Sequence, residues 1–403
     1  MANWARLQEQ LTGLPVVKRS RNSIHFDKGN GEIVANFSGA PCHYEENGEW
    51  KPIDTKLLLL PDGFYGSPHS DVKIHKDGRV KAGGYQQKSA LVDAKEGVVD
   101  GDKIVREFKF GTQYLYMKED GFRQETVITR PPTTAEAKYL IASESGELPS
   151  KYKRSDITAV DADGAVHEFV NLGQFKKWLD AAAYPVTIDP DFSGSAAEFR
   201  CYGQNADYAT ARASAYFGNA GGAQFEVGQA AGTYRINRTG LKFDTSAIGS
   251  DSTVTQVNLK LVATSDQSTT DFDVQIAKCD WSSLDPFAYG TRDASYDLLL
   301  TGDLDDSIWR NTSGMSANTQ YASGNLSTAW INKTGATYYA LRSKEDSDAS
   351  VPDGNEYVTI AMTAHATESY RPVLTVTYTT AGATGTLLRV NMNAQMQSLT
   401  GGY

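Results

Sequence analysis

The sequence predicts a mainly β protein with two antiparallel β-sandwich or jelly-roll domains and a few short helices. Three observations predict this class. Before residue 171, four segments each place an Asn-Gly or Asp-Gly pair between strand-like flanks, and such pairs supply the positive φ angles of tight hairpins. Short runs that alternate polar and apolar residues recur after residue 191. The 403 residues, 40% of them hydrophobic, are enough to build a buried core in each domain.

The elements of the first half follow in order. Trp4, Leu7 and Leu11 recur at helical spacing before Thr12-Gly13, which predicts a short amphipathic helix. The segment "LGQFKKWLDAAA" predicts one more helix, and "YPVTIDP" after it predicts a strand that ends at Pro190, since proline cannot donate to a ladder. Between the two helices, hairpins are predicted at "YEENGEW", "DVKIHKDGRVKAG", "YLYMKEDGFRQETVITR" and "DITAVDADGAVHEFV".

A change in composition after Asp189-Pro190 predicts a domain boundary between residues 189 and 194. Residues 191–380 are rich in Ser, Thr, Gly, Ala, Asn and Tyr, and many short strands with polar connections are typical of a β-sandwich or jelly roll. We therefore expect four parts, which are an N-terminal helix or arm (1–20), an N-terminal β-domain (21–190), a jelly-roll domain (191–380) and a linker with an assembly tail (381–403).

The tail predicts a contact with a partner. Leu388, Val390, Met392 and Met396 stand at alternate positions, the pattern of a half-buried strand, although Leu388, Met392, Met396 and Leu399 also fit a helical stripe. A disordered terminus is the alternative, but disordered tails are usually poor in such residues. A strand added to the sheet edge of a neighbouring subunit is the interpretation we favour.

Charge and cysteine content exclude several classes of protein. The 39 basic and 49 acidic residues give a net charge of −10, which argues against binding to nucleic acid or to anionic membranes. The three cysteines are widely spaced and form no Cys-x-x-Cys pair, so neither a zinc site nor a disulfide framework is expected. The first residues lack the apolar core of a secretion signal. We therefore expect a soluble protein that is made in a cytoplasm.

Three segments in the second half resemble the DNRLRE-type domain. They are "RTGLKFDTSAIGSDSTVTQVNLKLVAT" (238–264), "WSSL" (281–284) and "SYRPVLTVTY" (369–378). Asn258 stands where that family usually has alanine. "YPVTIDP" and "NGEWKPIDTKL" (47–57) are similar to stretches that accompany such domains in Rhs-like bacterial surface proteins and in bacteriophage virion proteins. The resemblance implies a jelly-roll fold for the second half and a companion β-domain before it.

One acidic loop is a candidate calcium site. In "KEDSDASVPDGNE" (344–356), Asp346, Asp348 and Asp353 stand in a turn-prone segment rich in the oxygen ligands that calcium prefers. The spacing does not match an EF-hand, so a solvated acidic loop is the interpretation we favour. No other cofactor is expected.

Aromatic residues are candidates for contact with sugar rings. Trp281, Trp309 and Trp330 could present flat faces to a glycan, but tryptophan more often fills a sandwich core. The histidines form no metal-ligand spacing, and no Gly-x-Ser-x-Gly elbow or phosphate-binding loop is present in the sequence. We therefore expect no catalytic residues.

These patterns lead to three functional hypotheses. The first is a non-enzymatic structural component of a bacteriophage virion, a head decoration, fibre or tail appendage that assembles with itself or with other virion proteins and contacts host surface glycan. The alternative is a carbohydrate-binding module or adhesin of a bacterial surface protein. A polysaccharide hydrolase or lyase is the third and the least favoured.

Overall fold

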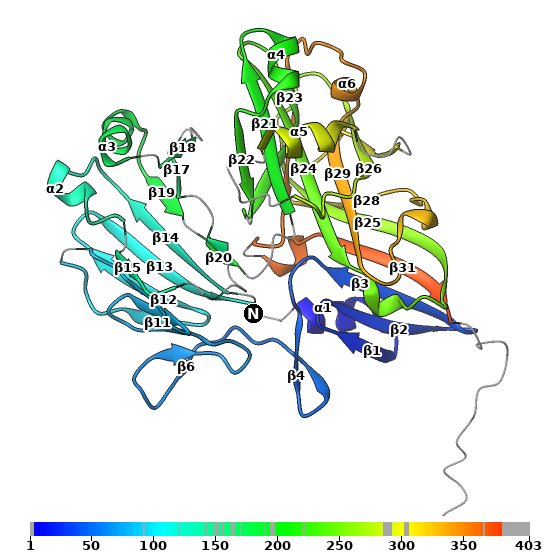
Figure 1. The fold of residues 1–403 in the computed structure, drawn as a ribbon, viewed down its shortest axis with the longest axis horizontal. Helices are drawn as coiled ribbons and strands as arrows, with labels where there is room; N and C mark the ends of the chain where they lie inside the picture. Colours follow the sequence, from blue (N-terminus) through cyan, green and yellow to red (C-terminus); the bar gives the residue numbers. More distant parts are fainter. Residues whose placement is uncertain are drawn as a thin grey trace, which may run out of the picture.

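The chain passes twice between two β lobes that lie side by side (Figure 1). The computed structural model describes residues 4–91, 93–119, 121–141, 143–147, 149, 153–154, 157–162, 166–169, 171–189, 191–193, 198–220, 222–284, 292–301, 306–365 and 367–380. We call residues 4–42 together with 198–380 the large lobe, and residues 53–193 the small lobe. The hairpin of β4 (His43–Glu46) and β5 (Glu49–Pro52) lies between them in the chain.

The large lobe is built on one 14-stranded antiparallel sheet. Its main path runs β1-β2-β3-β31-β25-β30-β23-β24-β29-β26-β27, while β21 pairs with β24, β22 with β21 and β28 with β25. The strands are β1 (Val16–Ser20), β2 (Ser23–Gly29), β3 (Glu32–Ser38), β21 (Glu198–Asn205), β22 (Phe217–Ala220), β23 (Gln224–Ala230), β24 (Tyr234–Asp244), β25 (Thr253–Asp266), β26 (Asp273–Lys278), β27 (Asp306–Asn311), β28 (Thr319–Ala322), β29 (Ala336–Ser343), β30 (Asn355–Ala361) and β31 (Val373–Thr379).

This sheet folds over on itself around one apolar core. Phe37 of β3 and Val376 of β31 lie in the same buried cluster as Leu241 of β24, Tyr339 of β29 and Ile276 of β26. Strands far apart along the sheet therefore face each other, as in a β-sandwich. The alternating runs of the second half supply the inward residues, which confirms the predicted fold class for this lobe.

Short helices cover the rest of the large lobe. α4 and α5 pack over the outer face of β21 and β24, where Phe199, Tyr296 and Leu299 belong to a second buried cluster. α1 packs near β2 and η4. The helical segments are α1 (Trp4–Thr12), α4 (Tyr208–Ala213), α5 (Arg292–Thr301) and α6 (Lys344–Ser347), with the 3-10 turns η1 (Ser246–Ile248), η3 (Thr328–Trp330) and η4 (Glu368–Tyr370).

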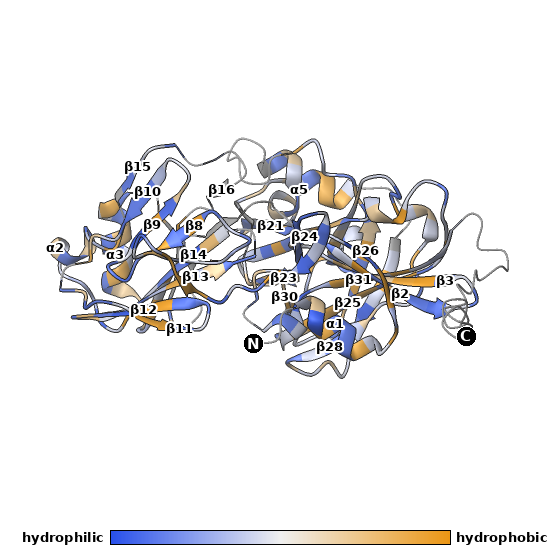
Figure 2. Cartoon of the chain, turned by 90° about the horizontal axis from the view of Figure 1, so that it is seen from below, coloured by the Kyte–Doolittle hydropathy of each residue, from blue (hydrophilic) through white to orange (hydrophobic). Residues whose placement is uncertain are grey.

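The first strands of the chain join the last strand. β3 pairs with β31 along seven residues, from Glu32 opposite Thr379 to Ser38 opposite Val373, and the two strands lie next to each other in Figure 2. The sequence predicts that residues 21–38 belong to an N-terminal β-domain (21–190), whereas the structure pairs them with the large-lobe sheet. β3 covers the free edge of β31, which would otherwise expose a row of backbone groups without partners.

The small lobe is a sandwich of two sheets. One sheet runs β15-β10-β9-β8-β7-β6, and the other runs β11-β12-β13-β14-β19-β17-β18, with β20 on β14 and β16 on β20. Val72 and Val80 of the first sheet share a buried cluster with Leu115 and Phe122 of the second. The strands are β6 (Leu58–Leu59), β7 (Tyr65–Gly66), β8 (Val72–Ile74), β9 (Arg79–Ala82), β10 (Tyr85–Lys88), β11 (Val98–Asp100), β12 (Lys103–Phe108), β13 (Gly111–Lys118), β14 (Gly121–Ile128), β15 (Ser143–Ser145), β16 (Lys153–Arg154), β17 (Thr158–Val160), β18 (Val166–Glu168), β19 (Val186–Asp189) and β20 (Asp191–Ser193).

Two helices, α2 (Thr134–Ala137) and α3 (Leu172–Ala181), complete the small lobe at its outer end (Figure 1). The predicted helices are present as α1 and α3, and α1 ends before Gly13, whose φ is +62°. All four predicted hairpins are present, as β4–β5, β8–β9, β13–β14 and β17–β18. β19 is the predicted "YPVTIDP" strand, but β20 follows it directly and still pairs with β14.

Candidate functional site

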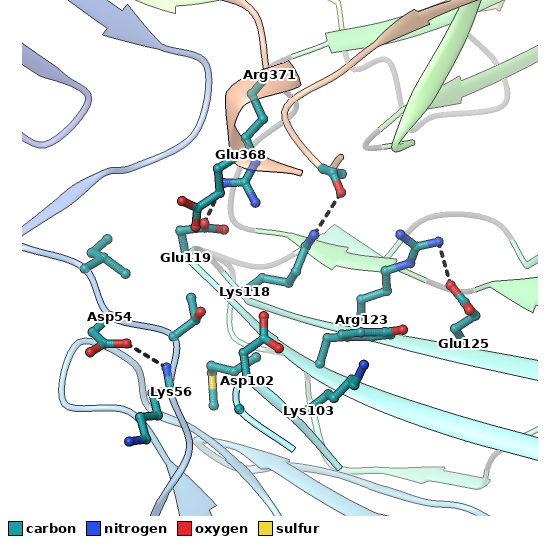
Figure 3. Close-up of a pocket in the computed structure, with 16 residues that line it drawn as sticks. Asp54, Lys56, Asp102, Lys103, Lys118, Glu119, Arg123, Glu125, Glu368 and Arg371 are labelled. Atoms are coloured by element: carbon teal, nitrogen blue, oxygen red, sulfur yellow. Dashed lines mark hydrogen bonds and ion pairs between the residues drawn. The ribbon is translucent and has the colours of Figure 1, made fainter. Parts of the chain in front are cut away.

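A pocket of about 460 Å³ opens where the two lobes meet (Figure 3). Its small-lobe side is formed by residues 53–56, by the 101–103 turn that leads into β12, and by β13 and β14. Its large-lobe side is formed by Ala364, Glu368 and Arg371, in and around η4. The volume is within the range of small-molecule sites in proteins. We call this the interlobe pocket.

The tip of the β13–β14 hairpin joins the lobes across this pocket. Nη1 of Arg371 donates to Oε1 of Glu119 at 2.6 Å, and Nζ of Lys118 donates to the carbonyl oxygen of Ala364 at 3.1 Å. The Glu119 and Arg371 side chains are only 12% and 7% exposed. Burial alone would raise the pKa of Glu119, but Arg371 and Lys118 bring it below its ordinary value. The Glu119 carboxyl at the hairpin tip is therefore ionised, and its ion pair with Arg371 anchors the tip to the large lobe.

Two other carboxyl groups of the pocket behave in the opposite way. Burial raises the pKa of Glu368 to about 7, although Arg371 lies nearby, and Glu119 adds to the rise. Oε2 of Glu368 is buried and has no hydrogen-bond partner. Burial also raises the pKa of Asp102, against the nearby charges of Lys118 and Lys103. Both groups lie on the pocket wall with acceptor capacity that the protein does not use.

A tyrosine adds an aromatic surface to the small-lobe side. Tyr116 of β13 is half-buried in the pocket wall, and its ring stacks on Tyr114 with centroids 6.0 Å apart. Nζ of Lys103 lies 5.9 Å from the Tyr116 ring centroid. Burial raises the pKa of the Tyr116 phenol beyond the physiological range, so the ring stays neutral. The pocket thus combines one aromatic face with charged groups from both lobes.

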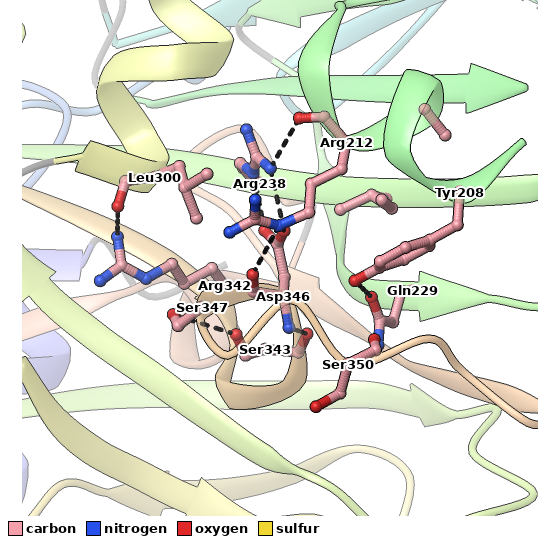
Figure 4. A network of polar contacts seen from close by, with 12 residues as sticks. Tyr208, Arg212, Gln229, Arg238, Leu300, Arg342, Ser343, Asp346, Ser347 and Ser350 are labelled. Atoms are coloured by element: carbon pink, nitrogen blue, oxygen red, sulfur yellow. Dashed lines mark hydrogen bonds and ion pairs between the residues drawn. The ribbon is translucent and has the colours of Figure 1, made fainter.

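The candidate calcium residues do not converge. Asp346 is 1% exposed, and its carboxylate accepts hydrogen bonds from Nε and Nη2 of Arg238 at 2.7 and 2.9 Å (Figure 4). Nε of Arg212 lies 3.3 Å from the same carboxylate. The sequence suggested a solvated loop here, but Ser343 caps α6 by accepting from the Asp346 amide, and this turn directs Asp346 inward. We call Arg212, Arg238 and Asp346 the buried ion network.

The other two aspartates of that segment have separate partners. Asp348 is exposed and forms an ion pair with Lys344, while Oδ1 of Asp353 accepts from the Thr270 hydroxyl at 2.9 Å. Among the residues that the structure describes, no three His, Cys, Asp or Glu side chains are arranged to hold a metal ion. The described part of the segment thus offers calcium no assembled ligand set.

The three candidate tryptophans lie in the core of the large lobe. Trp281 and Trp309 are each 3% exposed, and Trp330 is 5% exposed. Trp281 packs edge-on against Phe199 and Tyr338, with centroids 4.9 and 4.8 Å away. None of the three indoles therefore presents a face to a glycan, because burial of their large apolar surface stabilises the sandwich.

The tail residues Leu388, Val390, Met392 and Met396 lie outside the described residues. In the described ranges, no helix combines the length and the apolar character needed to cross a bilayer.

Sequence reasoning missed the interlobe pocket. "YLYMKEDGF" showed a hairpin but not that Glu119 at its tip meets Arg371, 252 positions later. Asp102 and Glu368 stand in segments with no recognisable motif. The one available signal was a charged hairpin tip, which most proteins leave in solvent.

Comparison with known proteins identifies no family. No protein-family model and no curated protein matches the sequence. A similar solved structure is the GH31 alpha-xylosidase Xac1773 from Xanthomonas citri, with 8% sequence identity and a TM-score of 0.16. The match covers 92% of this chain and 38% of that one. A TM-score this low supports no inference about fold or activity, and the resemblance to the DNRLRE-type domain stays a prediction.

Proposed function

We propose that the protein is a non-enzymatic structural component of a bacteriophage virion, acting as a head decoration, fibre or tail appendage. It assembles with itself or with other virion proteins. The large lobe carries the three segments that resemble DNRLRE-type domains, which occur in structural and adhesive proteins. The proposal takes a virion as the location, because "YPVTIDP" and "NGEWKPIDTKL" are similar to stretches that accompany such domains in bacteriophage virion proteins.

The observation that carries the proposal is the pairing of β3 with β31. Seven residue pairs join the beginning of the described chain to its end within one sheet, and the core beneath them is continuous. A sandwich held in this way resists fraying at both ends, because each terminal strand has ladder hydrogen bonds and buried side chains. Such a rigid body suits a part that keeps its shape in a particle.

Assembly is assigned to the segment that follows β31. In the sequence, the alternating residues Leu388, Val390 and Met392 follow the small-residue linker "TTAGATG". An alternating segment of this kind can add to an exposed sheet edge of a neighbouring subunit. The partners in this proposal are further copies of the chain or other virion proteins.

Truncation after Thr384 tests the proposal. We expect the truncated chain to keep the far-ultraviolet circular dichroism and melting curve of the full chain but to lose oligomerisation and incorporation into particles. Analytical ultracentrifugation and mass spectrometry of purified virions measure these outcomes. A matched control replaces the intervening Asn391 and Asn393 by Ser, which keeps the apolar alternation.

Three results would contradict parts of the proposal. Incorporation of the truncated chain at the full-length level would show that assembly does not need the tail. If the protein were absent from virions in which capsid and tail proteins are detected, it would not be a virion component. Release of reducing sugar from host polysaccharide by the purified chain would contradict its non-enzymatic part.

A further inference from the structure

The charges of the interlobe pocket are balanced. Five acidic and five basic side chains line it. A site for phosphate or a polyanion would carry an excess of positive charge, and a site for a cation would carry an excess of negative charge. A balanced set of donors and acceptors instead suits a neutral ligand with many hydroxyl groups. The ten residues are Asp54, Asp102, Glu119, Glu125, Glu368, Lys56, Lys103, Lys118, Arg123 and Arg371.

Part of this set is already used by the protein, and part is available. Arg371 and Glu119 hold each other, Lys118 is held by the Ala364 carbonyl, and Lys103 pairs with Asp100 at 3.3 Å. The buried Oε2 of Glu368 has no partner. A buried acceptor without a hydrogen bond destabilises the protein, and a ligand hydroxyl that reached this oxygen would remove that cost.

The second available group is the Asp102 carboxyl. Its nearest cations, Lys103 and Lys118, are engaged with Asp100 and Ala364. In Figure 3 it lies near the centre of the pocket, between Lys118 and Lys103. Asp102 belongs to the small lobe and Glu368 to the large lobe, so the two acceptors approach a bound ligand from opposite sides.

The aromatic ring gives the third element of recognition. Tyr116 lines the pocket and is fixed by its stacking on Tyr114. A pyranose ring has apolar C–H faces and hydroxyl groups around its edge. An aromatic face together with carboxylates at the side matches both parts of such a ring. The volume of about 460 Å³ accommodates one or two rings.

We propose that the interlobe pocket binds a neutral sugar of one or two rings, with Tyr116 against a ring face and with Asp102 and Glu368 accepting from its hydroxyl groups. This site goes beyond the structural role and does not depend on it, because none of its residues belongs to the assembly tail (381–403). It also differs from the tryptophan surface expected from the sequence. The ligand class follows from the charge balance, which disfavours acidic and phosphorylated sugars.

Titration calorimetry and saturation-transfer NMR with the full chain test the proposal. The probes are glucose, galactose, mannose, N-acetylglucosamine and the disaccharides cellobiose and lactose, with glucuronate and glucose 6-phosphate as charged counterparts. We expect at least one neutral sugar to bind in the millimolar range, with its ring protons receiving saturation from aromatic protein protons. The charged counterpart of the same sugar should bind more weakly.

Paired variants separate recognition from folding. Asp102→Asn and Tyr116→Ala should each weaken binding about tenfold, because each removes one interaction worth more than 1.4 kcal/mol. The matched controls are Asp62→Asn, which changes an exposed carboxylate of the small lobe outside the pocket, and Tyr116→Phe, which keeps the ring. Both controls should bind like the unchanged chain, and melting curves of all four variants verify that they fold.

Three outcomes would overturn the proposal. The first is no binding of any neutral probe to the unchanged chain. The second is tighter binding of the charged sugars than of the neutral ones. The third is equal loss in Asp102→Asn and Asp62→Asn, which would show that the loss does not come from the pocket. Loss of particle incorporation on tail truncation, by contrast, bears only on the structural role.

Discussion

In the buried ion network, the Asp346 carboxylate receives two hydrogen bonds from Arg238, and a second arginine lies against it. In the interlobe pocket, Glu368 has a buried oxygen without a partner, although Arg371 is nearby. Both regions place carboxylates beside arginines (Figures 3 and 4). They differ in that Asp346 meets its arginines, whereas the buried oxygen of Glu368 does not meet Arg371, which pairs with Glu119.

That difference distinguishes a carboxylate that stabilises the fold from one that can bind a ligand. A carboxylate that is fully paired is fixed in its ionised form and has no capacity for a ligand. A carboxylate that is buried but unpaired takes up a proton more easily and keeps a free acceptor. The first arrangement holds α6 to β24, and the second leaves the interlobe pocket ready to bind.

The largest expected effect comes from breaking the buried ion network. Asp346→Asn leaves the Arg238 guanidinium, which is 0% exposed, without its counter-charge. We expect a loss of about 3 to 5 kcal/mol in the free energy of unfolding, measured by urea denaturation at pH 7. The control is Asp348→Asn, which removes an exposed pair and should cost less than about 0.5 kcal/mol. Equal effects of the two variants would mean that Asp346 is not a buried structural ion.

A smaller effect is expected from the ion pair between the lobes. Glu119→Gln keeps a hydrogen-bond acceptor but removes the negative charge opposite Arg371, so we expect a loss of about 2 to 3 kcal/mol. Urea denaturation measures the loss. Glu9→Gln, in the more exposed pair with Arg19, is the control and should cost under about 1 kcal/mol. Unchanged stability of Glu119→Gln would show that the hairpin tip does not anchor the lobes.

The next effect depends on pH and comes from Glu368. Its pKa rises from 4.5 to about 7 in the folded chain, so the folded state binds this proton more tightly than the unfolded state. The resulting destabilisation is absent below about pH 4.5 and is complete above about pH 7. Glu368→Gln removes it, so the variant should match the unchanged chain at pH 4 and exceed its stability by about 2 kcal/mol at pH 8.

Urea denaturation at intervals between pH 4 and pH 8 gives this difference directly. A difference that stays constant across the range would contradict the raised pKa.

The smallest expected effect is that of calcium. Because Asp346 is occupied by arginines and Asp348 and Asp353 have separate partners, we expect the same melting temperature in chelator and in millimolar calcium. Differential scanning calorimetry measures this. A calcium-dependent rise in melting temperature that is lost in Asp353→Asn would show that the loop binds calcium, because a bound ligand stabilises the folded state by mass action.

Local signals in the sequence predicted local structure. Asn47 and Gly48 have φ angles of 54° and 81°, as a two-residue hairpin turn requires. The pairing of β3 with β31 could not be predicted in this way, since no local pattern specifies a partner at the other end of the chain. Asp346 illustrates the same limit, because its partner Arg238 lies 108 positions earlier.

The pairing of β3 with β31 also has a consequence for biosynthesis. A ribosome releases β2 and β3, with Ile24, Phe26 and Phe37, long before it makes β31. During that interval β3 lacks β31, one of its two final neighbours. The small lobe, encoded next, can already fold on its own sandwich. Completion of the large lobe is then a late, long-range closure, and such closures are slow because the intervening chain must be ordered first. Nascent chains stalled before residue 373 should accordingly recruit chaperones that bind apolar segments, and chains that have passed residue 379 should release them.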